Sequence, residues 1–326
     1  MVIPGLRLRR VAVMAFACLP LAPSPALANT KAVDLRVVDT AGRTLAQFRQ
    51  YTGTVNIRTD PRATCFGQGT GGSGNRVAVR GATALGAVRD ALESDPALRP
   101  LSVTDSFLDQ GFGLGVCGIG DGVSRGSSFW YLKRNHVASQ VSGSQLAVHQ
   151  GDDVLWYLAP SFPPPRELYL RAPASAEPNV PFRVTVYSYA DNGTRRPAAG
   201  AEVTDAAAPT DTSGHAMVTG ASGIDSLQAS HGRAIPSNLV TVCVQRDPSR
   251  CPAAHGKWIL GSSRRDYIVG TPGSDSIQAR GGRDVVDIRS GGRDRVGCGG
   301  GRDRVIVRRG DRNDHIRASC ERVVRR

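Results

Sequence analysis

The C-terminal region, roughly residues 264–320, repeats one tripeptide: an aspartate followed two positions later by a branched aliphatic residue. The six copies begin at Asp266, Asp275, Asp284, Asp294, Asp303 and Asp314. Consecutive aspartates are 9, 9, 10, 9 and 11 residues apart. Carboxylates at such regular spacing offer the oxygen ligands that a hard divalent cation prefers. The first chemistry that this sequence predicts is therefore cation binding.

A period of about nine residues is typical of a solenoid of stacked coils. In such a coil each short strand directs one aliphatic side chain into a narrow shared core, and the aspartate lies in the preceding turn. Glycine stands two residues before four of the aspartates, at Gly273, Gly282, Gly292 and Gly301. The region resembles the haemolysin-type (RTX) calcium-binding repeat, whose pattern is G-G-x-G-x-D-x-(aliphatic)-x. The resemblance implies a parallel β-roll over residues 258–326.

The same resemblance implies calcium as the cofactor, held between neighbouring turns by aspartates and backbone carbonyls. The candidate metal ligands are Asp275, Asp284, Asp294 and Asp303. The candidate turn glycines are Gly270, Gly273, Gly282, Gly292 and Gly301. Later copies place an arginine directly before the aspartate, so we expect weak binding centred on Asp275 and Asp284. The alternative is a degenerate roll held by arginine–aspartate pairs without metal.

Residues 1–28 have the pattern of a secretory signal peptide. Arginines precede the apolar run Val11–Leu21, and Ala26 and Ala28 form an A-x-A cleavage site before Asn29. No later stretch approaches the roughly twenty apolar residues of a membrane-spanning helix. We therefore expect a secreted, extracellular protein without a membrane span.

Six cysteines follow the expected signal peptide, and an even number agrees with an oxidising compartment. They are Cys65, Cys117, Cys243, Cys251, Cys298 and Cys320. The sequence cannot choose among their pairings. Two cysteines fall in each of three regions, however, which makes 65–117, 243–251 and 298–320 the economical set of disulfides.

Breaks in composition divide the chain into three parts. Phe162–Pro165 is a proline-rich spacer, and Arg246–Gly256 is a short polar connector. The expected fold is mainly β and multi-domain. It consists of a β-grasp-like α+β domain over 30–160, an Ig-like β-sandwich over 166–245, and the roll over 258–326.

The first part alternates strand patterns with one predicted helix. Leu85, Val88 and Leu92 form an apolar stripe at helical spacing, and Thr83 has the side chain of an N-cap for a helix through Glu93. This helix is the one element that would cover the sheet.

Two aromatic segments end the first part, Trp130–Asn135 and Gly151–Tyr157. With the preceding hairpin, helix and glycine-rich excursion they resemble the DUF4430 domain, which is similar to the C-terminal domain of transcobalamin and intrinsic factor. The resemblance implies a β-grasp-like sheet on one helix. It also implies an alternative function, a carrier of a small cobalamin-like ligand, with an apolar cavity flanked by Trp130 and Trp156.

The second part reads as a set of short strands with strong turns. Phe182, Val184 and Val186 alternate with polar residues, and Asn192–Gly193 is a hairpin turn. These features resemble the Ig-like repeats of bacterial surface proteins. We interpret this part as a spacer.

The net charge of +13 is concentrated in the tail. Residues 257–326 contain 17 basic and 9 acidic residues. We expect Arg295 and Arg304 to stack on the outside of one sheet, where they would meet an anionic cell-wall or surface polymer. We expect no nucleic-acid partner, because the tail lacks interleaved aromatic residues and the expected compartment is extracellular. We expect a monomer.

One pattern invites an enzyme. Gly122–Gly126 satisfies the G-x-S-x-G motif around Ser124, but a strand follows it where that motif requires a helix. A second alternative, an extracellular hydrolase, would need a cleft that joins Ser124 to a histidine. The function that the sequence predicts is a secreted, non-catalytic, modular binding protein with calcium in its roll.

Overall fold

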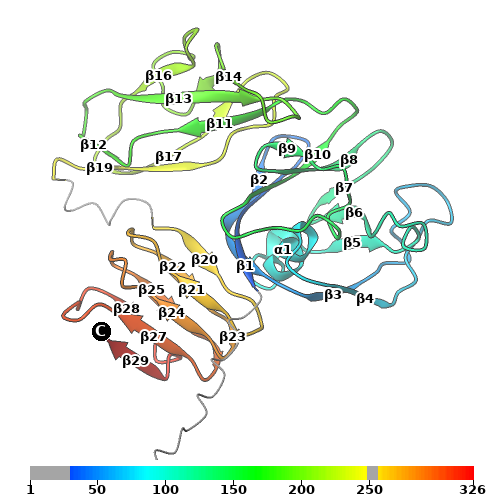
Figure 1. Ribbon diagram of the computed structural model, residues 1–326. Coiled ribbons are helices and arrows are strands. Elements are labelled where there is room, and N and C mark those ends of the chain that lie inside the picture. Colours follow the sequence, from blue (N-terminus) through cyan, green and yellow to red (C-terminus); the bar gives the residue numbers. More distant parts are fainter. Residues whose placement is uncertain (1–29, 248–255) are drawn as a thin grey trace, which may run out of the picture.

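The computed structural model describes residues 30–247 and 256–326. The expected signal peptide and Cys251 lie outside the described residues. Within them the protein is mainly β, with several sheets and one α-helix, which confirms the predicted fold class. Figure 1 shows three groups of strands, with the C-terminal roll beneath the sandwich and the first part beside both.

A nine-stranded sheet runs through the molecule in the order β28-β25-β22-β20-β2-β1-β10-β8-β9. Five of its strands come from the first part: β1 (Lys31–Val38), β2 (Thr44–Thr52), β8 (Phe129–Arg134), β9 (Val137–Ala138) and β10 (Asp153–Ala159). The other four come from the tail: β20 (Trp258–Leu260), β22 (Ser276–Gln278), β25 (Arg295–Gly297) and β28 (His315–Ile316).

The single helix, α1 (Ala84–Ala91), begins where predicted. The Thr83 Oγ1 accepts the Gly86 N–H at 3.0 Å, which satisfies one of the free amides of the first turn. Leu85 and Val88 are fully buried in one core cluster with the sheet. The helix ends two residues before the predicted Glu93.

A glycine-rich excursion with short strands completes the first part. Its elements are β3 (Val55–Arg58), β4 (Arg76–Val79), η1 (Pro96–Leu98), β5 (Leu101–Thr104), β6 (Gly115–Ile119) and β7 (Gly122–Val123). The predicted Cys65–Cys117 disulfide, with sulfurs 2.00 Å apart, ties the loop between β3 and β4 to β6.

The second part consists of small sheets around a common core. One contains β11 (Glu167–Arg171), β13 (Phe182–Tyr189), β14 (Arg195–Pro197) and β16 (His215–Val218). The others contain β12 (Ser175–Ala176), β17 (Gly223–Leu227) and β19 (Val240–Val244), and β15 (Glu202–Val203) with β18 (Ala229–Ser230). Val184 and Val186 of one sheet share a buried cluster with Val242 and Val244 of another, so the sheets face each other as in a sandwich.

Buried charges join the sandwich to the first part. The Glu167 carboxylate is fully buried and contacts the guanidinium of Arg36, the His136 Nδ1 at 3.1 Å and the Lys133 Nζ at 3.8 Å. Burial opposes ionisation of Glu167, but the His136 hydrogen bond and the two cations hold its pKa below the ordinary value.

The tail forms a parallel two-sheet solenoid. One sheet is the continuation of the nine-stranded sheet, and the other contains β21 (Tyr267–Val269), β24 (Val285–Asp287), β27 (Arg304–Val307) and β29 (Arg322–Arg325). Short strands β23 (Gly281–Gly282) and β26 (Gly300–Gly301) pair at one turn. The aliphatic residues of the repeats point inward from both sheets, so the narrow core predicted from the sequence is present.

Successive repeats alternate between the two sheets. Arg295 pairs with Ser276 and His315 in one sheet, whereas Arg304 pairs with Val285 and Arg322 in the other. The predicted stacking of Arg295 on Arg304 is therefore wrong, because neighbours within one sheet are two repeats apart. By the same geometry Cys298 and Cys320 lie one coil apart and form the predicted disulfide.

The roll does not stand apart from the first part of the chain. Its first strand, β20, pairs in parallel with β2, with Arg49 opposite Ile259 and Gln50 opposite Leu260. The Gln50 amide donates to the Leu260 and Gly261 carbonyls at 3.3 and 3.2 Å. A continuous sheet thus joins segments that are about two hundred residues apart in the sequence.

Candidate functional site

The acidic side chains of the repeats form two rows, one before the strands of each sheet of the roll. The first row consists of Asp266, Asp284, Asp303 and Glu321, and the second of Asp275, Asp294 and Asp314. Glu321 was not predicted, although it begins an acid-x-aliphatic tripeptide like the aspartates. The rows bring together all four predicted metal ligands, but in two separate pairs.

Beyond the first acid of each row, each carboxylate accepts a hydrogen bond from a backbone N–H of the preceding coil. Asp284 accepts the Asp266 N–H at 2.8 Å, and Asp303 accepts the Asp284 N–H at 2.9 Å. In the second row Asp294 accepts the Asp275 N–H at 2.8 Å. These acids therefore link the coils, a role that neither calcium nor arginine pairing requires.

The first acid of each row is also bonded to a hydroxyl residue four positions before it. The Asp275 Oδ1 accepts the Thr271 Oγ1 at 2.7 Å and the Lys257 N–H at 2.6 Å, and its Oδ2 accepts the Thr271 N–H. Ser262 donates to the Asp266 carboxylate in the same way, through its N–H and its hydroxyl. Both oxygens of these two carboxylates are thus occupied by protein donors.

The later acids lack this second partner. Arg280, Ser290, Gly299 and Gly310 stand four positions before them, and the Ser290 hydroxyl donates to the Thr271 carbonyl. One carboxylate oxygen remains buried and without a hydrogen bond in four acids: Asp284, Asp294, Asp303 and Asp314. Asp284, Asp294 and Asp303 are at most 2 % exposed. Such orphaned oxygens are costly unless a proton or a cation neutralises them.

Burial shifts the titration of these acids upward. It raises the pKa of Asp284 to about 8 and that of Asp294 to about 7, and neighbouring acids of the same row add to the shift. The hydrogen bond from the preceding coil opposes the shift in both cases. Asp284 and Asp294 therefore take up protons at a higher pH than an ordinary aspartate.

The turn glycines allow neighbouring coils to approach closely. Gly282, Gly292 and Gly301 have positive φ, and a Cβ on Gly301 would lie 1.6 Å from the Gly282 carbonyl oxygen. A Cβ on Gly292 would lie 2.3 Å from the Gly273 carbonyl oxygen, and one on Gly270 would lie 3.0 Å from the Asp275 Oδ2. Backbone carbonyls and carboxylates are therefore crowded together at these turns.

The arginines of the roll do not neutralise the rows. Across 30–247 and 256–326, no ion pair joins an arginine to an acid of either row; Arg289 pairs with Asp287 at 2.6 Å, outside them. The predicted alternative, a roll held by arginine–aspartate pairing, thus finds no such pair at the turns. The same described residues contain no cluster of three or more acidic, histidine or cysteine side chains placed to hold a metal.

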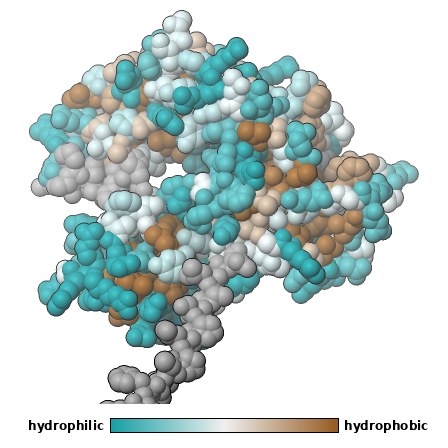
Figure 2. Space-filling view, viewed as in Figure 1, coloured by the Kyte–Doolittle hydropathy of each residue, from teal (hydrophilic) through white to brown (hydrophobic). Residues whose placement is uncertain are grey.

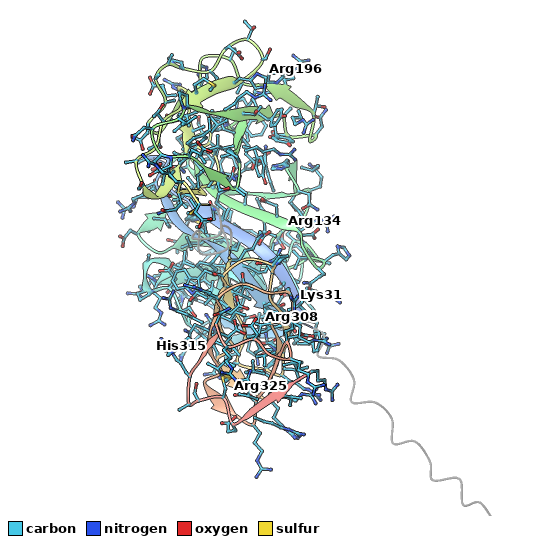
Figure 3. The ribbon with its side chains drawn as sticks, turned by 90° about the vertical axis from the view of Figure 1, so that its left-hand side faces the viewer. Lys31, Arg134, Arg196, Arg308, His315 and Arg325 are labelled. Atoms are coloured by element: carbon cyan, nitrogen blue, oxygen red, sulfur yellow. A yellow bond between two sulfur atoms is a disulfide. The ribbon has the colours of Figure 1, made fainter. Side chains whose placement is uncertain are left out.

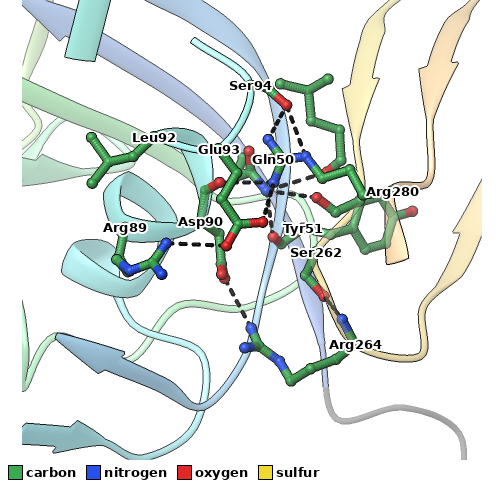
Figure 4. A network of polar contacts seen from close by, with 12 residues as sticks. Gln50, Tyr51, Arg89, Asp90, Leu92, Glu93, Ser94, Ser262, Arg264 and Arg280 are labelled. Atoms are coloured by element: carbon green, nitrogen blue, oxygen red, sulfur yellow. Dashed lines mark hydrogen bonds and ion pairs between the residues drawn. The ribbon is translucent and has the colours of Figure 1, made fainter. Parts of the chain in front are cut away.

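Two arginines instead fasten the roll to helix α1. The Arg280 Nη1 donates to the Asp90 carbonyl at 2.7 Å and its Nε to the Ser94 hydroxyl at 2.8 Å, while the Arg264 Nη2 lies 2.9 Å from the Asp90 carboxylate (Figure 4). Burial raises the pKa of Asp90 to about 6 despite the charge of Arg264. This network complements the backbone pairing of β20 with β2.

The residues of the two alternative functions lie in the first part. Trp130 and Trp156 are 9 % and 2 % exposed and belong to its hydrophobic core, where the Trp156 Nε1 donates to the Ala84 carbonyl. Ser124 is 7 % exposed, and its hydroxyl has no hydrogen-bond partner in the described part of the chain. No histidine is therefore placed to activate it there.

Comparison with known proteins adds no relative. The chain matches no protein-family model, and no curated protein is significantly similar to it. Among the residues with a described structure, no helix is both long and apolar enough to cross a membrane.

Proposed function

We propose that this is a secreted, non-catalytic binding protein whose C-terminal roll takes up calcium. The observation that carries the proposal is the set of buried carboxylates, Asp284, Asp294 and Asp303, each with one oxygen bonded to a coil amide and the other without a partner. A cation beside those oxygens would supply the missing charge.

The donor atoms at the turns suit calcium. Carboxylate and carbonyl oxygens are the ligands of a hard cation. Asp284 with Asp303 would hold an ion in the first row, and Asp294 with Asp314 in the second. Asp275 is left out of this set because Thr271 and Lys257 already occupy both of its oxygens.

The supply of charged ligands argues for weak binding. Neighbouring acids of a row offer two carboxylates per site, and the described residues contain no group of three or more acidic, histidine or cysteine side chains placed to hold one ion. Backbone carbonyls and water would complete the six to eight oxygens, as in extracellular sites with dissociation constants on the order of 0.1–1 mM.

Export is supported by the disulfides. Cys65–Cys117 and Cys298–Cys320 both have bonding geometry, and such bonds persist in oxidising compartments. Mass spectrometry of protein recovered from the culture medium tests this point: the mature chain should begin near Asn29 and contain no free thiol.

Calcium binding is tested on the full mature chain by calorimetry and thermal unfolding, with calcium or with a chelator. Asp303→Asn and Asp294→Asn should each remove part of the heat of binding and part of the rise in Tm. Asp287→Asn is the matched control, since this acid belongs to the roll but pairs with Arg289 outside both rows. Absence of heat at about 10 mM calcium, well above the weakest such constants, would refute the proposal.

A cationic end of the roll supports a second element, contact with an anionic surface polymer. Arg304 lies beside Arg322 on neighbouring strands, and Arg308 and Arg325 extend the charge along the last coils (Figure 3). Figure 2 shows that hydrophilic side chains dominate the outer edge of the roll. Retention on an immobilised polyphosphate should weaken with salt and fall in Arg322→Gln, whereas retention that is independent of salt would contradict it.

A further inference from the structure

A cavity of about 520 Å³ lies where the three parts of the chain meet. Strands β1, β2 and β10 contribute charged residues to its lining, the sandwich contributes Tyr169 and Leu239, and the first coil of the roll contributes Lys257 and Trp258. This volume is typical of sites for small ligands, which span roughly 300–1,000 Å³. None of these residues belongs to the acid rows.

Three charged residues form one line across the sheet inside this cavity. Asp34 of β1 is the register partner of Arg49 on β2 and of Asp153 on β10. Neighbouring strands are about 4.8 Å apart, so the Cα atoms of Arg49 and Asp153 are separated by roughly 10 Å. Opposite charges thus occupy the two ends of a short line.

Positive charge is in excess at the Arg49 end. The Asp34 carboxylate accepts the Arg49 Nε at 3.1 Å and the Lys257 Nζ at 2.7 Å. Two cations therefore share one carboxylate, which leaves one positive charge over. The remaining donors of Arg49 and Lys257 are free to bind an anionic group.

Negative charge is in excess at the Asp153 end. Arg36 and Lys133 are balanced by Glu167 and Asp191, with the Lys133 Nζ 3.2 Å from the Asp191 carboxylate, and the His136 ring contacts Glu167 at 3.1 Å. The Asp153 carboxylate makes no hydrogen bond or ion pair with any residue of the described structure, where only its backbone is bonded. The cavity is therefore nearly neutral in total but strongly dipolar.

Two further observations indicate a missing polar partner. The Nε of Arg36, a lining residue that is 2 % exposed, has no hydrogen-bond acceptor. Burial raises the pKa of Asp153, and the nearby Glu167 and Asp34 add to the shift, although Arg36 and His136 oppose it. A bound cationic group would remove that penalty.

We propose that this cavity binds a small zwitterion, of the size of an amino acid or a dipeptide, with its ammonium group on Asp153 and its carboxylate on Arg49 and Lys257. Phe48, Leu239 and Val240 in the lining give an apolar side chain of the ligand a surface to pack against. The site is independent of calcium and goes beyond the function proposed for the roll.

The test uses three forms of one probe on the full mature chain, in the presence of a calcium chelator. L-alanyl-L-leucine should bind in calorimetry, whereas its N-acetyl form, which lacks the ammonium, and its C-terminal amide, which lacks the carboxylate, should each bind at least about tenfold more weakly, because a buried charge loses its partner. Equal binding of the three forms, or no binding of the zwitterion, would overturn the proposal. Since calcium is absent, neither result depends on the acid rows.

Variants separate ligand binding from folding. Asp153→Asn should weaken binding of the dipeptide at least about tenfold while Tm stays the same or rises, because the substitution removes an unpaired charge from a half-buried position. Lys257→Met should weaken binding of the dipeptide but leave the already weak binding of its C-terminal amide unchanged. Asp109→Asn, on an exposed loop of the first part, is the control and should change neither. Undiminished binding in Asp153→Asn would refute the assigned role of this carboxylate.

Discussion

The first and the last turns of the roll contain the same repeat, but they satisfy the oxygens of their buried aspartates in different ways. In the first turns Ser262 and Thr271 donate to the aspartates, and β20 pairs with β2 of the first part. In the last turns no side-chain hydroxyl of the described residues donates to the aspartates, and the Cys298–Cys320 disulfide closes the coil. At the first turns, which we call the docked end, protein groups alone satisfy both oxygens of each carboxylate. At the last turns, the free end, only protons or cations can balance the charge of the buried carboxylates.

This difference teaches that a repeat motif fixes the backbone of a solenoid more firmly than its chemistry. The amide-to-carboxylate bond recurs from coil to coil with distances of 2.8–3.1 Å. The partner of the second oxygen depends on a single position, four residues earlier. Calcium affinity and coil stability are therefore separable properties of this roll.

The largest expected effect comes from a substitution that disrupts the stacking of coils at the free end. In Gly301→Ala the new Cβ would collide with the Gly282 carbonyl, and the φ of +139° would be strained as well. Together these effects should lower the free energy of unfolding by about 4 kcal/mol. In Gly300→Ala nothing lies within 4 Å of the new Cβ, so that variant should change stability by less than about 1 kcal/mol. Equal urea midpoints for the two variants would show that the coils are not packed this closely.

Removal of the disulfide should loosen the free end selectively. The bond closes a loop with a sequence separation of 22 residues, so the double variant Cys298→Ser, Cys320→Ser should lose about 3 kcal/mol. Hydrogen exchange measured by mass spectrometry should accelerate in β28 and β29 and remain slow in β20. Uniform acceleration along the roll would contradict a distinction between its two ends.

At the docked end, Arg280→Met should lose about 2 kcal/mol because its hydrogen bonds to α1 and Ser94 disappear. Arg283→Met is the matched control, since Arg283 is exposed on the same roll and its loss should be nearly neutral. Chemical denaturation measures both. A similar loss in the two variants would mean that Arg280 contributes no more than general surface charge.

The last prediction concerns how the stability of the metal-free roll depends on pH. Because folding raises the pKa of Asp284 to about 8, the metal-free protein should be most stable in mild acid and lose stability as the pH rises from about 4 through 8. Asp284→Asn should flatten this dependence and make the metal-free protein more stable than the parent chain at pH 8.5. Calcium should stabilise the parent chain more at pH 8.5 than at pH 6, and a pH-independent Tm would contradict the shifted titration.

The local features of the fold were accessible from the sequence. The repeat period predicted the inward-facing Ile268, Ile277 and Val296, and Thr83 marked the start of the helix, because both patterns arise within a few residues. The hydroxyls at Ser262 and Thr271 were also readable, four positions before their aspartates, but a carboxylate pattern taken alone suggests metal first.

The long-range features were not accessible. Pairing of β20 with β2 leaves no local pattern, since any edge strand offers the same amides and carbonyls. The cavity beside Asp153 depends on that pairing and on the position of the sandwich, so its residues come from all three parts of the chain. The predicted placement of Arg295 and Arg304 on one sheet was wrong because each coil contains two strands, so consecutive repeats lie in different sheets.

The junction of β20 with β2 also sets an order of events in folding. Contacts between residues so distant in sequence form slowly, whereas each later coil only has to settle on the one before it. We therefore expect the edge of β2 to act as a template for the first coil, with the later coils stacking on that coil. A chain made from its N-terminus supplies the template first, so synthesis and assembly run in the same sense.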